Sequence, residues 1–107
     1  MLEAIMDITF FNKTSPLFRE WAGYNGERIL RPTFNLGGIL VSGNIISDEK
    51  MYYWDRKYTV LVDFFTVDTP GTYPGLESKL FVGGEYDIQL ASKVIGKAIM
   101  IDYCFYN

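Results

Sequence analysis

Short apolar runs, separated by turn-forming residues, make up most of this chain. Two arms rich in β-branched and other apolar residues, 27–36 and 39–46, flank the pair Gly37-Gly38. A two-residue connection between antiparallel strands needs positive φ at one or both central positions, which glycine adopts readily. The pattern therefore predicts a tight β-hairpin. Gly43, inside the second arm, indicates a bulge or the close approach of another backbone segment.

Strand patterns recur along the rest of the chain. Residues 1–11 alternate imperfectly between apolar and polar positions and end in the turn-forming run N-K-T-S-P. Residues 58–67 are the strongest predicted strand, and their apolar side chains occupy both faces, which is typical of a central or wrapped strand. Residues 86–90 and 94–105 are expected to pair across the turn at residues 91–93.

Turn residues separate these strands. Residues 68–75 contain two Pro-Gly pairs and are predicted to form a loop, which residues 76–81 either continue or follow with a short strand. Residues 16–25 are predicted to be a loop with at most one helical turn. Because no stretch has a sustained helical period, we expect a single all-β domain over residues 1–107, either a sandwich or a barrel.

Two stretches of the chain carry a family resemblance. The first, R-P-T-F-N-L-G-G-I-L-V-S-G-N-I over residues 31–45, resembles a strand pair in the third, C-terminal β-barrel domain of elongation factor Tu and related translational GTPases. The second, Y-D-I-Q-L-A-S-K-V-I-G-K-A-I-M over residues 86–100, is similar to that family's aromatic-x-Ile strand, basic turn and aliphatic-Gly strand. The resemblance implies a six-stranded antiparallel Greek-key β-barrel.

The chain also departs from that family. Ala91-Ser92 stands where the family has a double glycine, Ala98 replaces a further glycine, and the loop over residues 68–84 is different. The phosphate-binding motif G-x-x-x-x-G-K-[ST] is absent from the sequence. In elongation factor Tu the domain has no chemistry of its own, holds neighbouring domains and touches a bound tRNA. What the resemblance implies for a stand-alone copy is therefore a barrel that binds a protein partner.

Charge and composition narrow the function further. The 49% hydrophobic content of the 107 residues predicts a folded globular protein, and ten basic against thirteen acidic residues leave a net charge of -3. Such a chain lacks the dense basic array that nucleic acids attract, so we expect no nucleic-acid partner. The apolar runs are too short to span a membrane and the N-terminal residues are acidic, which predicts a cytoplasmic protein with no membrane partner.

Candidate chemistry is sparse. The chain has no His, one Cys, and no D-x-D or E-x-x-E spacing. We therefore expect no catalytic residue, metal site or cofactor, and we expect that the protein is not an enzyme. Carboxylates could still meet in space, for example Asp63 with Asp87 or Asp102, although positions facing the surface are the simpler interpretation. Cys104 lies in an apolar run and is predicted to be a buried small hydrophobe. Arg31 is predicted to form an ion pair at a barrel edge.

Aromatic residues are the strongest candidates for a binding site. Two interpretations are open: they form a stacking platform or the anchors of a protein interface, or they are half-buried strand aromatics that close a small barrel. Tyr73, flanked by two Pro-Gly pairs, is predicted to be the most exposed. The candidate binding residues are Trp54, Tyr73, Tyr52, Tyr53, Trp21 and Tyr24, with Tyr58 beside them.

Two functions of different classes follow. The first is a non-catalytic protein-binding module, for instance a small acidic bacterial immunity or toxin-neutralising protein or an accessory protein, whose partner is basic. The alternative is a β-barrel that binds a small ligand, a sugar or a nucleotide, with the aromatic cluster over residues 52–58. Residues 103–106 are a possible edge strand, through which a homodimer could form.

Overall fold

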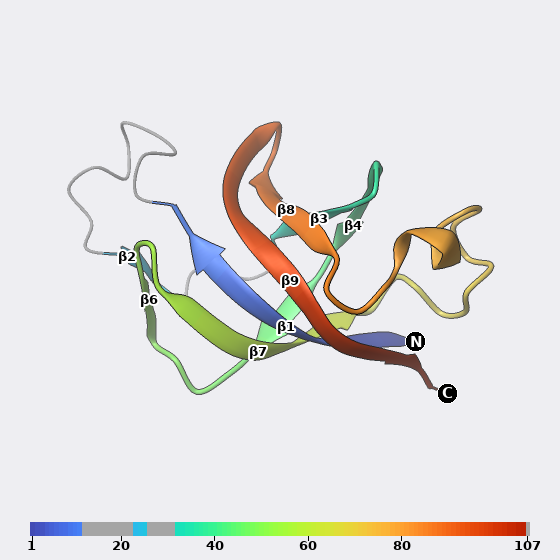
Figure 1. Ribbon diagram of the computed structural model, residues 1–107, viewed down its shortest axis with the longest axis horizontal. Coiled ribbons are helices and arrows are strands. Elements are labelled where there is room, and N and C mark those ends of the chain that lie inside the picture. The colour runs from blue at the N-terminus through green and yellow to red at the C-terminus, as the bar shows by residue number, and fades with distance from the viewer. Residues whose placement is uncertain (12–22, 26–31, 107) are drawn as a thin grey trace.

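The computed structural model describes residues 1–11, 23–25 and 32–106 (Figure 1). This part of the chain contains β-strands and a single 3₁₀ turn over Glu77–Lys79. The strands are β1 (Leu2–Phe10), β2 (Gly23–Asn25), β3 (Thr33–Leu36), β4 (Ile39–Ser42), β5 (Asn44–Ile46), β6 (Met51–Tyr53), β7 (Lys57–Phe64), β8 (Glu85–Leu90) and β9 (Lys93–Phe105).

One antiparallel sheet of seven strands carries the fold. Its strand order is β4-β3-β8-β9-β1-β7-β5, and β2 pairs separately with β6. The strands at the two ends of this order, β4 and β5, are consecutive in the chain with only Gly43 between them. A flat sheet could not place its two ends one residue apart, so the sheet curls into a half-barrel, as Figure 1 shows. The prediction of an all-β, barrel-like fold is confirmed.

The predicted β3–β4 hairpin is present. Gly37 and Gly38 have φ of +66° and +102°, and Leu36 pairs with Ile39 across them. The Asn35 side chain strengthens the turn, because its Oδ1 accepts a hydrogen bond of 2.7 Å from the Gly38 amide. Part of the first predicted arm, residues 27–31, lies outside the described residues. This part includes Arg31, for which an ion pair was predicted.

Gly43 lies where the chain bends from one end of the sheet to the other. Its amide donates a 3.0 Å hydrogen bond to the carbonyl of Pro32. A Cβ atom at this position would lie 2.7 Å from a ring carbon of Phe34 and 2.8 Å from Cγ1 of Val62. The expected approach of another backbone segment is therefore made by Pro32 at the Gly43 amide, while two core side chains fill the space that a Cβ atom would need.

The core is formed by alternate side chains that point into the curled sheet. Phe34 of β3 and Phe64 of β7, the strands next to the two ends of the sheet, meet edge to face with their ring centroids 5.2 Å apart. Val67, Leu76 and Leu80 come from the segment after β7 and are buried with the strand residues. Among the described residues, the largest fully buried side chains are Phe10, Phe34, Phe64, Leu2, Met6, Ile8, Leu36, Leu76, Ile88, Ile95, Met100 and Val41.

Several predicted boundaries differ from the structure. Strand β7 ends at Phe64, and a turn follows in which the Val67 amide bonds to the Phe64 carbonyl at 3.0 Å. Residues 76–81 contain the 3₁₀ turn and no strand. Residues 23–25, which were expected to lie in a loop, form the short strand β2; the rest of that predicted loop lies outside the described residues.

Candidate functional site

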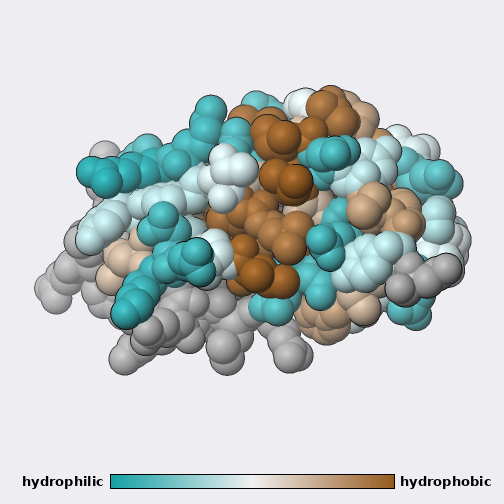
Figure 2. All heavy atoms as spheres, turned by 90° about the horizontal axis from the view of Figure 1, so that it is seen from below, coloured by the Kyte–Doolittle hydropathy of each residue, from teal (hydrophilic) through white to brown (hydrophobic). Residues whose placement is uncertain are grey.

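An apolar row crosses the outer face of four neighbouring strands. Leu61 of β7 pairs with Ile46 of β5 on one side and with Ile5 of β1 on the other, and Ile101 of β9 lies beside Ile5. Ile46, Ile5 and Ile101 are 47%, 41% and 42% exposed. An apolar band also crosses the face of the molecule seen in Figure 2. We call these four side chains the outer apolar row.

A β-bulge in β9 is the reason that Ile101 joins this row. Ile5 pairs with Asp102 and Met6 with Met100, so that Ile101 is the extra residue on β9. Met100 is buried, whereas both Ile101 and Asp102 are exposed. The bulge therefore places two consecutive side chains of β9 on the outside of the sheet.

The same bulge reverses the alternation of the residues that follow it. Counting by twos from buried Met100 would place Cys104 in the core, but its side chain is exposed, opposite Glu3. The prediction that Cys104 is a buried hydrophobe is wrong for this reason. Tyr103 and Phe105, which strict alternation would place outside, are instead half-buried against the core.

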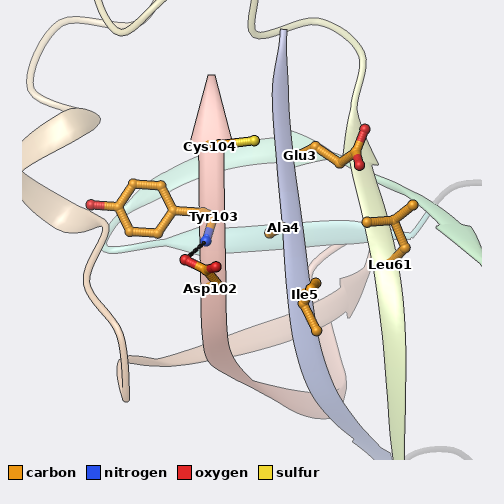
Figure 3. Close-up of a pocket in the computed structure, with 7 residues that line it drawn as sticks. All are labelled: Glu3, Ala4, Ile5, Leu61, Asp102, Tyr103 and Cys104. Carbon is orange, nitrogen blue, oxygen red and sulfur yellow. Dashed lines mark hydrogen bonds between the residues drawn. The ribbon is translucent and has the colours of Figure 1, made fainter. Parts of the chain in front are cut away.

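A small groove lies in the outer face where β1, β7 and the bulged part of β9 meet (Figure 3). Its volume is about 100 Å³. Drug-sized ligands generally occupy pockets of roughly 300–1,000 Å³, so this groove matches a single side chain better than a whole small molecule. It is lined by Glu3, Ala4, Ile5, Leu61, Asp102, Tyr103 and Cys104.

Two residues of β9 give the groove its shape. The Asp102 carboxylate turns back along the strand, where its Oδ1 accepts a 2.9 Å hydrogen bond from the Tyr103 amide. The Tyr103 ring points away from the groove in Figure 3, and its hydroxyl donates to the Leu80 carbonyl at 3.2 Å. The groove is consequently bordered by the Asp102 side chain and the Tyr103 backbone, while the ring anchors β9 to the segment after the 3₁₀ turn.

Carboxylates surround the outer apolar row. Glu3 and Asp63 lie opposite one another on β1 and β7, two residues from Ile5 and Leu61, and Asp7 lies two residues from Ile5 in the other direction. Asp102 completes this set, which we call the acidic rim: Glu3, Asp7, Asp63 and Asp102. Like charges placed directly opposite across two strands repel one another.

The polar contacts of the acidic rim are few within the described part of the chain. Asp7 accepts a hydrogen bond from the Thr59 hydroxyl. Asp63 Oδ1 is enclosed and has no hydrogen-bond partner among the described residues. Beside them, a hydrogen bond to the Glu3 carboxylate raises the pKa of Tyr106 above 10.0. The rim is therefore a region of concentrated negative charge.

Lysine residues lie further along the same strands. Lys57 of β7 and Lys97 of β9 both pair with Thr9, four residues from Ile5, which is about 13 Å along β1. Lys97 is also engaged by Glu85, with 3.3 Å between Nζ and Oε2. The outer face thus has an acidic end near Glu3 and a basic end near Thr9.

The predicted aromatic residues do not form one exposed cluster. Tyr52 is buried, with its ring centroid 5.5 Å from that of Phe10 and 5.1 Å from that of Tyr58, and its hydroxyl hydrogen-bonds with Ser47. Burial raises the pKa of its phenol above 10.0. Tyr52 therefore has a packing role, and its ring is not available as a stacking platform.

The neighbours of Tyr52 are more accessible. Tyr53 is exposed, and the Arg56 guanidinium lies 5.3 Å from the centroid of its ring, a cation–π contact. Trp54 is half-buried against the core. These residues lie beside the end of β1 at Phe10, whose carbonyl bonds to the Asp55 amide, and so are remote from Glu3.

The remaining aromatic candidates are also separate. Tyr73 is half-buried and donates a 3.2 Å hydrogen bond to Thr66, so the prediction that it is the most exposed aromatic is wrong: Phe81, at 58%, is the more exposed. Trp21 lies outside the described residues. Tyr24 is described by its backbone, which pairs with Tyr52 in the β2–β6 ladder. Sequence reasoning missed Phe81, because its exposure depends on a turn that carries no apolar periodicity.

The carboxylates and the possible metal ligands have defined positions in the described part of the structure. No group of three or more Cys, Asp or Glu side chains there could hold a metal ion. Strands β1 and β9 separate Asp63 from Asp87 in the sheet, while Asp63 and Asp102 lie opposite different residues of β1. Within the described ranges, helices long and apolar enough to cross a bilayer are likewise absent.

Comparison with known proteins gives no assignment. No protein-family model matches the chain, and no curated protein matches it significantly.

Proposed function

We propose that this chain is a non-catalytic protein-binding module that binds its partner with the outer face of β5, β7, β1 and β9. The observation that carries this proposal is the outer apolar row, which lies on four adjacent strands and is bordered by carboxylates. Contiguous exposed apolar surface with a polar border is typical of protein interfaces. The row lies on paired strands, and such a rigid surface needs little ordering when a partner binds.

The proposed architecture is a six-stranded Greek-key barrel like the third domain of elongation factor Tu. Counting β4 and β5 as one strand bent at Gly43 leaves six strands in the curled sheet, which supports this proposal. The segment that carries the first motif of the resemblance forms the β3–β4 hairpin and this bend. In the family, that barrel serves to hold other protein domains, in agreement with a binding role.

The proposed biological setting is that of a small acidic cytoplasmic protein which neutralises or accompanies a basic partner, as a bacterial immunity or toxin-neutralising protein does. The net charge of -3 and the acidic rim support it, because complementary charge accelerates association and selects the partner. A small-ligand barrel has less support, because Tyr52 is buried and the groove has a volume of only about 100 Å³.

Affinity capture from the source organism tests the proposed function. The double variant Ile5→Thr, Ile46→Thr keeps strand-forming, β-branched side chains but removes apolar surface from the row. Leu40→Thr is the matched control, because Leu40 is 56% exposed on β4 and lies outside the row. We expect wild type and the control to capture the same stoichiometric partner and the double variant to lose it. No stoichiometric partner for wild type, or equal capture by the double variant, would refute the function.

A further inference from the structure

We propose that the partner segment which binds the outer apolar row is basic as well as apolar, and that it inserts one Lys or Arg side chain into the groove formed by β1, β7 and β9. This inference rests on the proposed function, since it names the chemistry of the partner at that surface. The aliphatic part of the inserted side chain would lie against Ile5 and Leu61, and its cationic group would lie between the Glu3 carboxylate on the β7 side and the Asp102 carboxylate on the β9 side (Figure 3).

The shape of the groove favours an unbranched side chain. Ala4 is a core residue and lines the groove with its backbone, while Ile5 and Leu61 border the groove from neighbouring strands (Figure 3). Its volume of about 100 Å³ suits one narrow chain of methylene groups. Lys and Arg bury such a chain against apolar surface while the charged end reaches polar groups.

The charges around the groove favour a cation. Glu3 and Asp102 both line it, and Asp63 lies opposite Glu3 with one enclosed carboxylate oxygen that has no hydrogen-bond partner among the described residues. Within the described ranges, the lysines that pair with Thr9 lie close to Asp7 but six residues, about 20 Å, from Glu3, so they do not neutralise the Glu3 end of the acidic rim. A cation from a partner would relieve the repulsion between Glu3 and Asp63.

The same charges argue against a second copy of this chain as the occupant. A two-fold axis parallel to the strands would place the two acidic rims face to face, and each copy carries a net charge of -3. A basic, apolar segment of another protein complements both features of the surface. The occupant to which we commit is therefore such a segment.

Peptide selection provides a direct test. Random 12-residue peptides displayed on phage are selected against the wild-type protein, and the enriched peptides are titrated into ¹⁵N-labelled protein. We expect enriched sequences with Lys or Arg beside apolar residues and shifts at Glu3, Ile5, Leu61, Asp102 and Cys104. The double variant Glu3→Gln, Asp102→Asn should weaken their binding at least tenfold.

The control variant is Asp68→Asn, Glu77→Gln, which removes the same two charges from exposed positions outside the groove. We expect it to weaken binding less than threefold. Enriched peptides that shift the row residues but bind both double variants equally would overturn the basic-anchor inference and leave the proposed function standing. Peptides that bind another surface, or no enrichment, would count against both.

Discussion

Replacing Gly43 by alanine tests whether this residue joins the two ends of the sheet as tightly as the structure indicates. The added Cβ would lie 2.7 Å from Phe34 and 2.8 Å from Val62, both of which are fully buried. Both neighbours are enclosed in the core, and overpacking of this kind costs about 1–3 kcal/mol. With contact on two sides, we expect a loss near the upper end, about 2–3 kcal/mol of the free energy of unfolding.

Urea denaturation followed by tyrosine and tryptophan fluorescence measures this loss. With an m-value of about 1.5 kcal/mol per molar urea, the midpoint should fall by about 1.3–2 M. Val62→Ala alone should cost about 2 kcal/mol, because it removes two buried methyl groups and leaves a cavity. In the Gly43→Ala, Val62→Ala double variant one of the two clashes is gone, so the loss should be about 1–2 kcal/mol smaller than the sum of the single losses.

Gly38→Ala is the matched control. Gly38 has φ of +102° and no described heavy atom within 4 Å of an added Cβ, so its substitution should cost about 1–3 kcal/mol through backbone strain alone. Val62→Ala should not rescue it. Strictly additive losses for Gly43→Ala and Val62→Ala, or a change below about 0.5 kcal/mol for Gly43→Ala, would refute the packing argument.

Three further predictions concern single groups. Cys104 should react within minutes with a thiol reagent in the native protein, and Cys104→Ser should change the free energy of unfolding by less than about 0.5 kcal/mol; a protected thiol would contradict its exposure. The raised pKa of Tyr52 means that its neutral form is favoured by folding, so its contribution to stability is present below pH 10.0 and declines above it; in urea melts from pH 8 to 11, Tyr52→Phe should show a shallower decline than wild type. Self-association through the C-terminal strand should be weak, because the Asp102 carboxylate occupies the Tyr103 amide; light scattering should give a monomer for wild type, and a wild-type dimer would contradict this expectation.

Local sequence signals account for much of the fold. The Gly37-Gly38 pair predicts the β3–β4 hairpin because only a few residue types adopt positive φ at low cost. Alternating apolar residues locate β1, β7, β8 and β9, because a strand with one buried face repeats every two residues. Gly43 indicates a position with little room for a side chain. The sequence does not say that side chains from two other strands, Phe34 and Val62, take up that room.

The candidate site could be predicted far less well. The β-bulge at Ile101 shifts the alternation of buried and exposed side chains in β9. The sequence has no glycine or turn residue at this position that would predict a bulge. The bulge turns Cys104 outward and Tyr103 inward, so a count by twos fails for both residues. Tyr52 and Tyr73 were reasonable candidates for exposed anchors, but an aromatic ring is buried or exposed according to its neighbours in space.

The sequence by itself determined the all-β class, the hairpin and the absence of histidine chemistry, because these depend on backbone preferences and on which residues are present. Only the tertiary structure decided where the exposed apolar surface lies. Ile5, Ile46, Leu61 and Ile101 are far apart in the chain, and each is unremarkable in its own strand. Strand register brings them into one row, and the β-bulge supplies its last member together with the carboxylate of Asp102.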